Sequence, residues 1–188
     1  IAKTATGKAI AVATSSKFGI GNAQYRHAKH RQYVDTVFGG CFYKKNVLKI
    51  GGFNENWVRN QDYEFNYRLR KKIGPITLDP SIRCQYYCRE SISQLYKQYF
   101  SYGFWRFNTL RTHPSSFTYR QAAPVLLCLG LIVSVISIFS GLAIAWLIPL
   151  LYVSACIAVS VNLASENRNA KLLPILPVIF ATLHISWG

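Results

Sequence analysis

The segment GGFNENWVRNQDYEFNYRLRKK, residues 51–72, decides how the rest of this sequence is interpreted, because it gathers acidic side chains in a strongly basic chain. It contains Glu55, Asp62 and Glu64, whereas the 188 residues hold only seven Asp and Glu against 22 Lys and Arg. Asn60 is a residue type that caps helices. A helix starting after Asn60 places Asp62 in its first turn, where the helix dipole favours an ionised carboxylate. Two interpretations of Asp62 stay open here: it only stabilises the helix start, or it acts as a general base.

Short elements are predicted around this segment from the spacing of apolar residues and from the Gly and Pro breakers. A left-handed Gly51 or Gly52 is expected to end the helix that precedes the segment. The predicted helices are residues 5–13, 44–50 and 60–72, and the predicted strands are residues 34–43, 76–78 and 82–87.

The last third of the chain is apolar and predicts a membrane region. No side chain from residue 121 to residue 165 is charged, and one helical crossing needs only about 20 apolar residues. Arg168 and Lys171 are the only cations after position 120. The positive-inside rule therefore places residues 1–120 and the Arg168 and Lys171 loop in the cytosol of a multi-pass cell-membrane protein. The predicted crossings are residues 122–139, 142–163 and 172–188, with the last one truncated.

Residues 91–120 are predicted as an interfacial segment whose helix starts at a capping box at Ser91, reaches toward Thr112 and is closed by Pro114. Aromatic residues alternate with Lys and Arg along it. Such a mixture can stack on single-stranded nucleic acid. It can also lie at the headgroup level of a membrane, with its cations reaching toward water. Because the apolar region begins a few residues later, the sequence favours an amphipathic interfacial helix, with membrane lipid rather than nucleic acid as the partner.

The cysteines and His184 carry little functional signal. Cys84 and Cys88 are four residues apart, but no His stands nearby at a ligand spacing, so zinc binding is not predicted. All five cysteines are interpreted as reduced. His184 falls within the third predicted crossing, where a polar side chain marks a site or bonds a neighbouring helix, and no role is assigned to it.

Four stretches together resemble a known family. They are VDTVFGGCFYKKNVLKIGGFNENW (34–57), NQDYEFNYRLRKKIG (60–74), QYFSYGFWRFNTLRTHP (98–114) and HISWG (184–188). They are similar to the Gly-Gly-Phe turn, the Glu-Asp motif helix, the aromatic basic segment and the last membrane helix of family 2 glycosyltransferases, especially membrane-bound bacterial enzymes that build succinoglycan-type exopolysaccharide.

The resemblance implies an α/β fold and a division of the chain into three parts. Residues 1–90 would be the C-terminal half of a GT-A domain, residues 91–120 the interfacial helix, and residues 121–188 about three transmembrane helices. The implied activity is inverting transfer of a sugar from a nucleotide-sugar donor to a lipid-linked or polysaccharide acceptor at the cytosolic membrane face. Its context would be exopolysaccharide or cell-envelope glycan synthesis.

The resemblance also implies which residues act. The Asp of the family's Glu-Asp motif is the catalytic base and matches Asp62. The family's Gln-x-x-Arg-Trp position, found in processive members, is matched only in part and with a different spacing. The residues expected to bind substrate are Gly39, Gly40, Gln61, Gln98, Trp105 and Arg106.

Two departures from the family limit the prediction. Gln61 stands where the motif has Glu, and no Asp-x-Asp occurs in the chain. The divalent metal of the family, Mg²⁺ or Mn²⁺, is therefore expected only through a motif absent here, and the chain is predicted to be a fragment that lacks the donor-binding half. The alternatives are a non-catalytic basic membrane adaptor and an inactive glycosyltransferase remnant.

Overall fold

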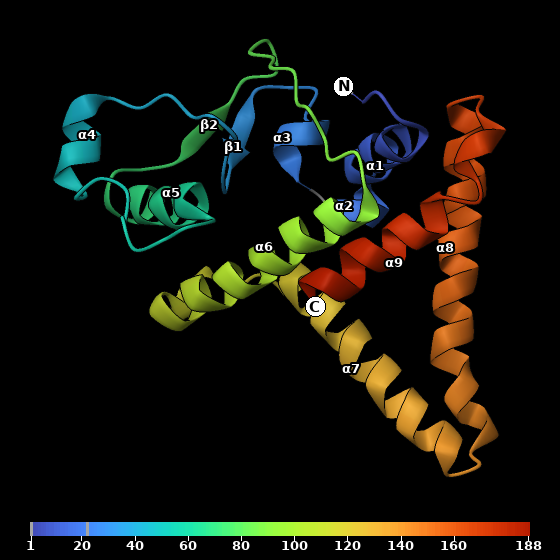
Figure 1. Cartoon of the computed structure of the whole chain (residues 1–188). Coiled ribbons are helices and arrows are strands. Elements are labelled where there is room, and N and C mark those ends of the chain that lie inside the picture. Colours follow the sequence, from blue (N-terminus) through green and yellow to red (C-terminus); the bar gives the residue numbers. More distant parts are fainter. Residues whose placement is uncertain (1, 22) are drawn as a thin grey trace. The chain divides into compact units, whose positions relative to one another are not determined.

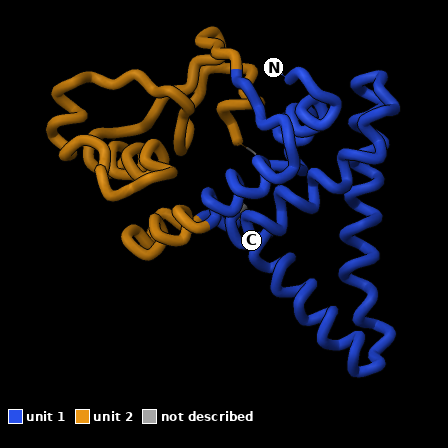
Figure 2. Tube along the Cα trace, viewed as in Figure 1, with its two compact units in different colours: residues 1–21, 86–103, 118–188 blue, residues 22–85, 104–117 orange. Residues whose placement is uncertain are grey.

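The computed structural model describes residues 2–21 and 23–188 and is mainly helical (Figure 1). These residues divide into two compact units (Figure 2). Unit 1 comprises residues 2–21, 86–103 and 118–188, and unit 2 comprises residues 23–85 and 104–117. The elements are α1 (Ala5–Ser15), α2 (Lys17–Ile20), α3 (Gln24–His27), β1 (Gln32–Val34), α4 (Lys44–Lys49), α5 (Gln61–Lys72), β2 (Ile76–Leu78), α6 (Ile92–Thr112), η1 (Pro114–Ser116), α7 (Tyr119–Phe139), η2 (Ala143–Trp146), α8 (Leu147–Glu166), η3 (Ala170–Leu172) and α9 (Leu176–Trp187).

Helix α5 is the centre of unit 2. Its residues Phe65 and Leu69, four apart on one face, are buried in a core that also contains Val34, Ile50 and Ile76. The helix predicted over residues 60–72 is confirmed. The predicted side-chain cap is wrong, because Asn60 adopts a left-handed conformation (φ 58°) and makes no side-chain capping bond to the helix.

The sheet of unit 2 is smaller than the sequence predicts. Among the described residues it has two strands, β1 and β2, which pair antiparallel with Val34 opposite Ile76. The strand predicted over residues 34–43 is wrong beyond Val34, because the chain turns through Gly39 (φ 64°) and packs Phe42 against Phe65 instead. The strand predicted over residues 82–87 is also wrong, since that exposed segment has no neighbouring strand to pair with. The α/β GT-A fold is therefore not confirmed.

The Gly-Gly turn ends α4 as predicted. Gly51 (φ 84°) and Gly52 (φ 69°) both adopt positive φ, which only glycine reaches without a steric penalty. The Gly52 N–H donates to the carbonyl of Val47 at 3.0 Å, and the Gly51 N–H donates to that of Leu48 at 3.1 Å. These bonds satisfy carbonyls at the helix end that would otherwise lack a partner.

In unit 1, α1 packs against α9 through a buried apolar core. The helix predicted over residues 5–13 is confirmed and runs two residues further. His184 of α9 lies 3.0 Å by Nδ1 from the Tyr152 hydroxyl of α8 and 2.8 Å by Nε2 from the Phe18 carbonyl. Both ring nitrogens are thus engaged, so hydrogen bonding to neighbouring elements accounts for this polar residue.

Two helical segments among the described residues are long and apolar enough to cross a membrane by length and composition. They are Gln121–Phe139 and Ala143–Glu166, with mean hydropathies of 2.6 and 2.2. A tight turn at Gly141 (φ 75°) joins them, as predicted (Figure 1). The third predicted crossing, residues 172–188, is not confirmed, because α9 has 12 residues and buries Leu176, Ile179 and Phe180 within unit 1.

Glu90 holds the start of α1, and this contact predicts a pH dependence. Its carboxylate accepts hydrogen bonds from the Thr4 hydroxyl (2.6 Å) and from the N–H groups of Lys3 and Thr4 (both 2.9 Å). These bonds lower the pKa of Glu90 from 4.5 to about 2. A carboxyl group with a depressed pKa stabilises the fold fully above its ordinary pKa and loses that effect as pH falls.

We therefore expect Glu90→Gln to lower the thermal unfolding temperature above pH 4.5, with the difference from the unsubstituted protein shrinking as pH falls through about 2. Thermal unfolding in detergent micelles across this pH range measures it. A difference that stays constant down to the lowest pH would show that ionised Glu90 does not hold α1.

Candidate active site

Asp62 lies in the first turn of α5, and its side chain is exposed. Oδ1 accepts a hydrogen bond of 2.8 Å from the backbone N–H of Tyr63. The carboxylate thus faces solvent in the first turn of a 12-residue helix. Gln61 is also exposed and directly precedes it.

Glu64, one helical turn from the start of α5, has a different role from Asp62. Its side chain is only 2% exposed and pairs with Arg68 in a bidentate arrangement, Nε to Oε1 at 2.6 Å and Nη2 to Oε2 at 2.8 Å. His113 Nε2 lies 3.1 Å from the same Oε1. Burial acts to raise the pKa of Glu64, but the hydrogen bonds from Arg68 and His113 outweigh it and lower the pKa below the ordinary value. Glu64 is therefore buried and ionised, and together with Arg68 and His113 it forms a buried cluster, the Glu64 anchor.

Arg68 extends this anchor to the Gly-Gly turn. Its Nη1 donates to the carbonyl of Ile50 at 2.6 Å, and its Nη2 donates to that of Gly52 at 2.7 Å. One guanidinium thus holds both the carboxylate of α5 and the chain that leaves α4. The planar fork of donors suits this task, which a lysine ammonium could not perform in the same way.

Arg106 contacts the first turn of α5 through Tyr63. Its guanidinium carbon lies 3.5 Å from the centre of the Tyr63 ring, and its Nη2 donates to the Ser116 carbonyl at 3.1 Å. The Tyr63 hydroxyl donates to the same carbonyl at 3.3 Å. Arg106 is 5% exposed. The structure therefore places it beside the residue that follows Asp62, and its predicted contact with substrate stays a prediction.

Trp57 connects the loop between the Gly-Gly turn and α5 to the last turns of α6. Its ring lies 6.0 Å from that of Trp105, and its Nε1 donates to the Thr109 hydroxyl at 3.3 Å. Asp62 is followed by Tyr63, whose ring contacts Arg106. Gln61 precedes Asp62, and Trp105 precedes Arg106, so these four predicted site residues belong to two contacting segments of unit 2.

The remaining predicted residues are positioned differently. Gly39 and Gly40 lie in the exposed loop between β1 and α4, where a side chain at Gly40 would meet Phe42 and Val37. Gln98 belongs to unit 1. Its Nε2 donates to the hydroxyls of Tyr86 (3.2 Å) and Tyr102 (2.7 Å), and its Oε1 accepts from Arg89 Nε (3.2 Å). Their proposed contacts with substrate stay predictions.

Sequence reasoning missed the anchor built on Glu64. The spacing of Glu64 and Arg68, four residues apart on one helix, was a readable signal for an ion pair. The participation of His113 and of the Ile50 and Gly52 carbonyls had no such signal, because these groups lie 16 to 49 residues away in the chain.

No group of three or more His, Cys, Asp or Glu side chains within residues 2–21 and 23–188 could hold a metal ion. The described residues therefore do not fit the divalent cation that the family resemblance implies.

Comparison with known proteins confirms the resemblance to glycosyltransferases of glycan synthesis. No protein-family model matches the chain, and no solved structure matches it significantly. Two curated proteins do match it along nearly its whole length.

The first is the succinoglycan biosynthesis protein ExoA of Rhizobium meliloti, which is 26% identical over 182 residues, or 96% of this chain and 54% of that protein. The second is the dolichyl N-acetyl-alpha-D-glucosaminyl phosphate 3-beta-D-2,3-diacetamido-2,3-dideoxy-beta-D-glucuronosyltransferase of Methanococcus voltae, 27% identical over 179 residues, or 89% of this chain and 50% of that protein. The chain thus spans about half the length of the curated relatives it matches.

Proposed function

We propose that this chain is the acceptor-side and membrane part of an inverting glycosyltransferase that moves a sugar from a nucleotide-sugar donor to a lipid-linked or polysaccharide acceptor. The observation that carries the proposal is the exposed Asp62 carboxylate on a braced helix start. Glu64 and Arg68 hold α5 to the Gly-Gly turn, while Tyr63 and Arg106 hold it to the chain after α6. A base held in this way loses little orientational freedom when an acceptor binds.

In the proposed reaction, Asp62 accepts the proton of an acceptor hydroxyl. The oxygen attacks the anomeric carbon of the donor sugar as the bond from that carbon to the nucleoside diphosphate breaks. The electron pair of the broken bond leaves with the diphosphate, and attack from the opposite face inverts the anomeric centre. General-base catalysis of this kind typically contributes about 10²–10⁴-fold to a rate.

We place the reaction at the cytosolic face of a membrane. Only 6% and 17% of the most apolar stretch of each candidate span is buried in the structure. The core helix of a soluble protein is instead mostly buried. Their exposed faces therefore suit lipid. Of the 22 Lys and Arg, 20 lie in the first 120 residues, and the remaining two, Arg168 and Lys171, follow the second span. This distribution supports the cytosolic placement.

Helix α6 supports an interfacial position. Four aromatic residues at positions i, i+4, i+8 and i+11 share one face of the helix, and all are exposed: Tyr96, Phe100, Phe104 and Phe107, at 48, 55, 56 and 65%. A continuous aromatic stripe beside cationic side chains is typical of a helix lying at the headgroup level.

This placement predicts that a tryptophan at position 104 contacts lipid. In vesicles, Phe104→Trp should add fluorescence that lipids brominated in the upper acyl chain quench strongly, relative to the parent protein. Tyr33→Trp is the matched control, because Tyr33 is exposed on β1 rather than on α6. Equal quenching at both positions would contradict the interfacial assignment of α6.

The function itself is tested by assaying the membrane protein together with whatever sequence flanks this chain in its gene. Incubation with nucleotide sugars and a lipid-linked acceptor should release nucleoside diphosphate in step with a glycosylated product. Salt-sensitive binding to anionic vesicles with no consumption of any nucleotide sugar would instead support the adaptor alternative, which the basic charge and the stripe of α6 also permit.

A further inference from the structure

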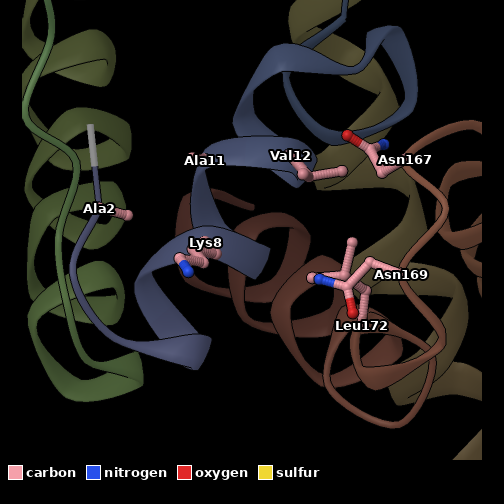
Figure 3. A pocket seen from close by; sticks show the side chains of 7 residues that line it. All are labelled: Ala2, Lys8, Ala11, Val12, Asn167, Asn169 and Leu172. Carbon is pink, nitrogen blue, oxygen red and sulfur yellow. The ribbon is translucent and has the colours of Figure 1, made fainter.

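A hollow of about 300 Å³ opens in unit 1 between α1 and the loop that follows α8 (Figure 3). The loop contains two cations, Arg168 and Lys171, and the residues that it contributes to the hollow flank them in sequence. From α1 the lining residues include Lys8, Ala11 and Val12, and from the loop they include Asn167, Asn169 and Leu172.

The hollow lies where the chain leaves the second candidate span. That span ends at Glu166, and Asn167 follows it directly. Helix α1 shares one buried core with α8 and α9, since Ile10 of α1 is in the same cluster as Ala164 of α8 and Leu176 of α9. With the membrane placement proposed above, the hollow is therefore at the headgroup level of the cytosolic leaflet.

The polar side of the hollow suits an anion. Lys8 is an exposed cation on its wall, and the Asn169 side chain accepts from the Lys171 N–H through Oδ1 at 3.2 Å, which orients its amide NH₂ group away from that bond. The described lining residues include no acid. Glu166 is the acid nearest to Asn167 in sequence, and its carboxylate accepts from Asn162 at 2.7 Å. Glu90 is bound at the start of α1, where its carboxylate accepts from the Lys3 and Thr4 N–H groups and from the Thr4 hydroxyl, and it does not line the hollow.

The remaining wall is apolar, formed by Ala11, Val12 and Leu172. The Lys8 ammonium and the Asn169 amide lie beside this apolar wall. Such a site suits an amphipathic ligand with an anionic group at one end and hydrocarbon at the other. Basic groups at the cytosolic end of a span attract anionic headgroups.

We propose that this hollow binds the phosphate group of an anionic membrane lipid. Lys8 pairs with the phosphate, the Asn169 amide donates to it, and the glycerol and upper acyl region lies along Val12 and Leu172. The proposal rests on the membrane placement and is independent of sugar transfer, so a failed transfer assay leaves it standing.

The experiment uses the whole chain in a non-ionic detergent, with phosphatidic acid as the probe and native mass spectrometry to count bound lipid. We expect one phosphatidic acid to bind preferentially, and Lys8→Gln to weaken it about tenfold, which corresponds to about 1.4 kcal/mol. The matched control is Lys17→Gln, which removes another exposed lysine of unit 1 that does not line the hollow. Ala11→Leu, which narrows the hollow without changing the charge, should also weaken binding.

Three outcomes would overturn the proposal. Equal weakening by Lys8→Gln and Lys17→Gln would assign the binding to the general positive charge of the chain. Unchanged binding in both Lys8→Gln and Ala11→Leu would place the lipid elsewhere. Competition by inorganic phosphate at concentrations similar to that of the lipid would assign the site to free phosphate. Thermal unfolding of each variant without lipid verifies folding, and Lys8→Gln, at an exposed position, keeps the test decisive if Ala11→Leu does not fold.

Discussion

Asp62→Asn should lower the rate of sugar transfer by about 10²–10⁴-fold, the typical contribution of a general base. Asn keeps nearly the same volume and can still accept from the Tyr63 N–H, which lies 2.8 Å from Asp62 Oδ1. It cannot take a proton from the acceptor hydroxyl. The loss should therefore appear in kcat, while KM for donor and acceptor changes little.

The matched control for this prediction is Glu55→Gln, which neutralises another exposed acid in the same segment. We expect it to leave transfer nearly unchanged. Both enzymes would be assayed with identical nucleotide sugar and acceptor, and thermal unfolding would show that both are folded. Near-normal transfer by Asp62→Asn would refute the assignment of this residue as the base.

Glu64→Ala should destabilise unit 2 by about 3–5 kcal/mol, the usual cost of removing one partner from a buried ion pair. Glu64 is 2% exposed, and its loss leaves the Arg68 guanidinium without its carboxylate. His113 loses the same partner. The expected loss of stability is large because one carboxylate holds groups from α5 and from the chain after α6.

Denaturant unfolding in micelles, followed by tryptophan fluorescence, measures this effect, since Trp57 and Trp105 both belong to unit 2. Glu55→Ala is the control and should stay within about 0.5 kcal/mol of the parent, as exposed substitutions usually do. A loss below about 1 kcal/mol for Glu64→Ala would show that the anchor contributes no more than an exposed pair.

The same anchor should depend on pH in a defined direction. The pKa of Glu64 lies below its ordinary value of 4.5, so the ionised carboxylate stabilises the folded state fully above about pH 4.5. The contribution is lost as pH falls through the lowered pKa. The difference between the parent and Glu64→Gln should therefore narrow in acid, and a difference that widened there would contradict the ion-pair account.

Features that depend on neighbouring residues were predictable from the sequence. The helices over residues 5–13, 44–50 and 60–72 follow from apolar spacing and from breakers such as Gly51 and Gly52, whose positive φ angles the structure confirms. The two candidate spans follow from an uncharged apolar run, and the turn between them follows from Ser140 and Gly141. The resemblance to glycosyltransferases follows from motif order along the chain, and the comparisons agree with it.

Features that depend on distant residues were decided only by the tertiary structure. A strand exists only beside a partner, so residues 82–87 have strand-like composition but form no strand. Likewise, α9 is apolar enough to suggest a crossing but is buried among other helices of unit 1.

The segment of residues 51–72 shows the same division most clearly. Its sequence by itself determined a Gly-Gly turn followed by a helix with Asp62 in the first turn. Only the tertiary structure separated its carboxylates, leaving Asp62 exposed and burying Glu64 against Arg68 and His113. The physical reason is that the cost of burying a charge depends on the partners that surround it. Those partners come from chain segments up to 49 residues away.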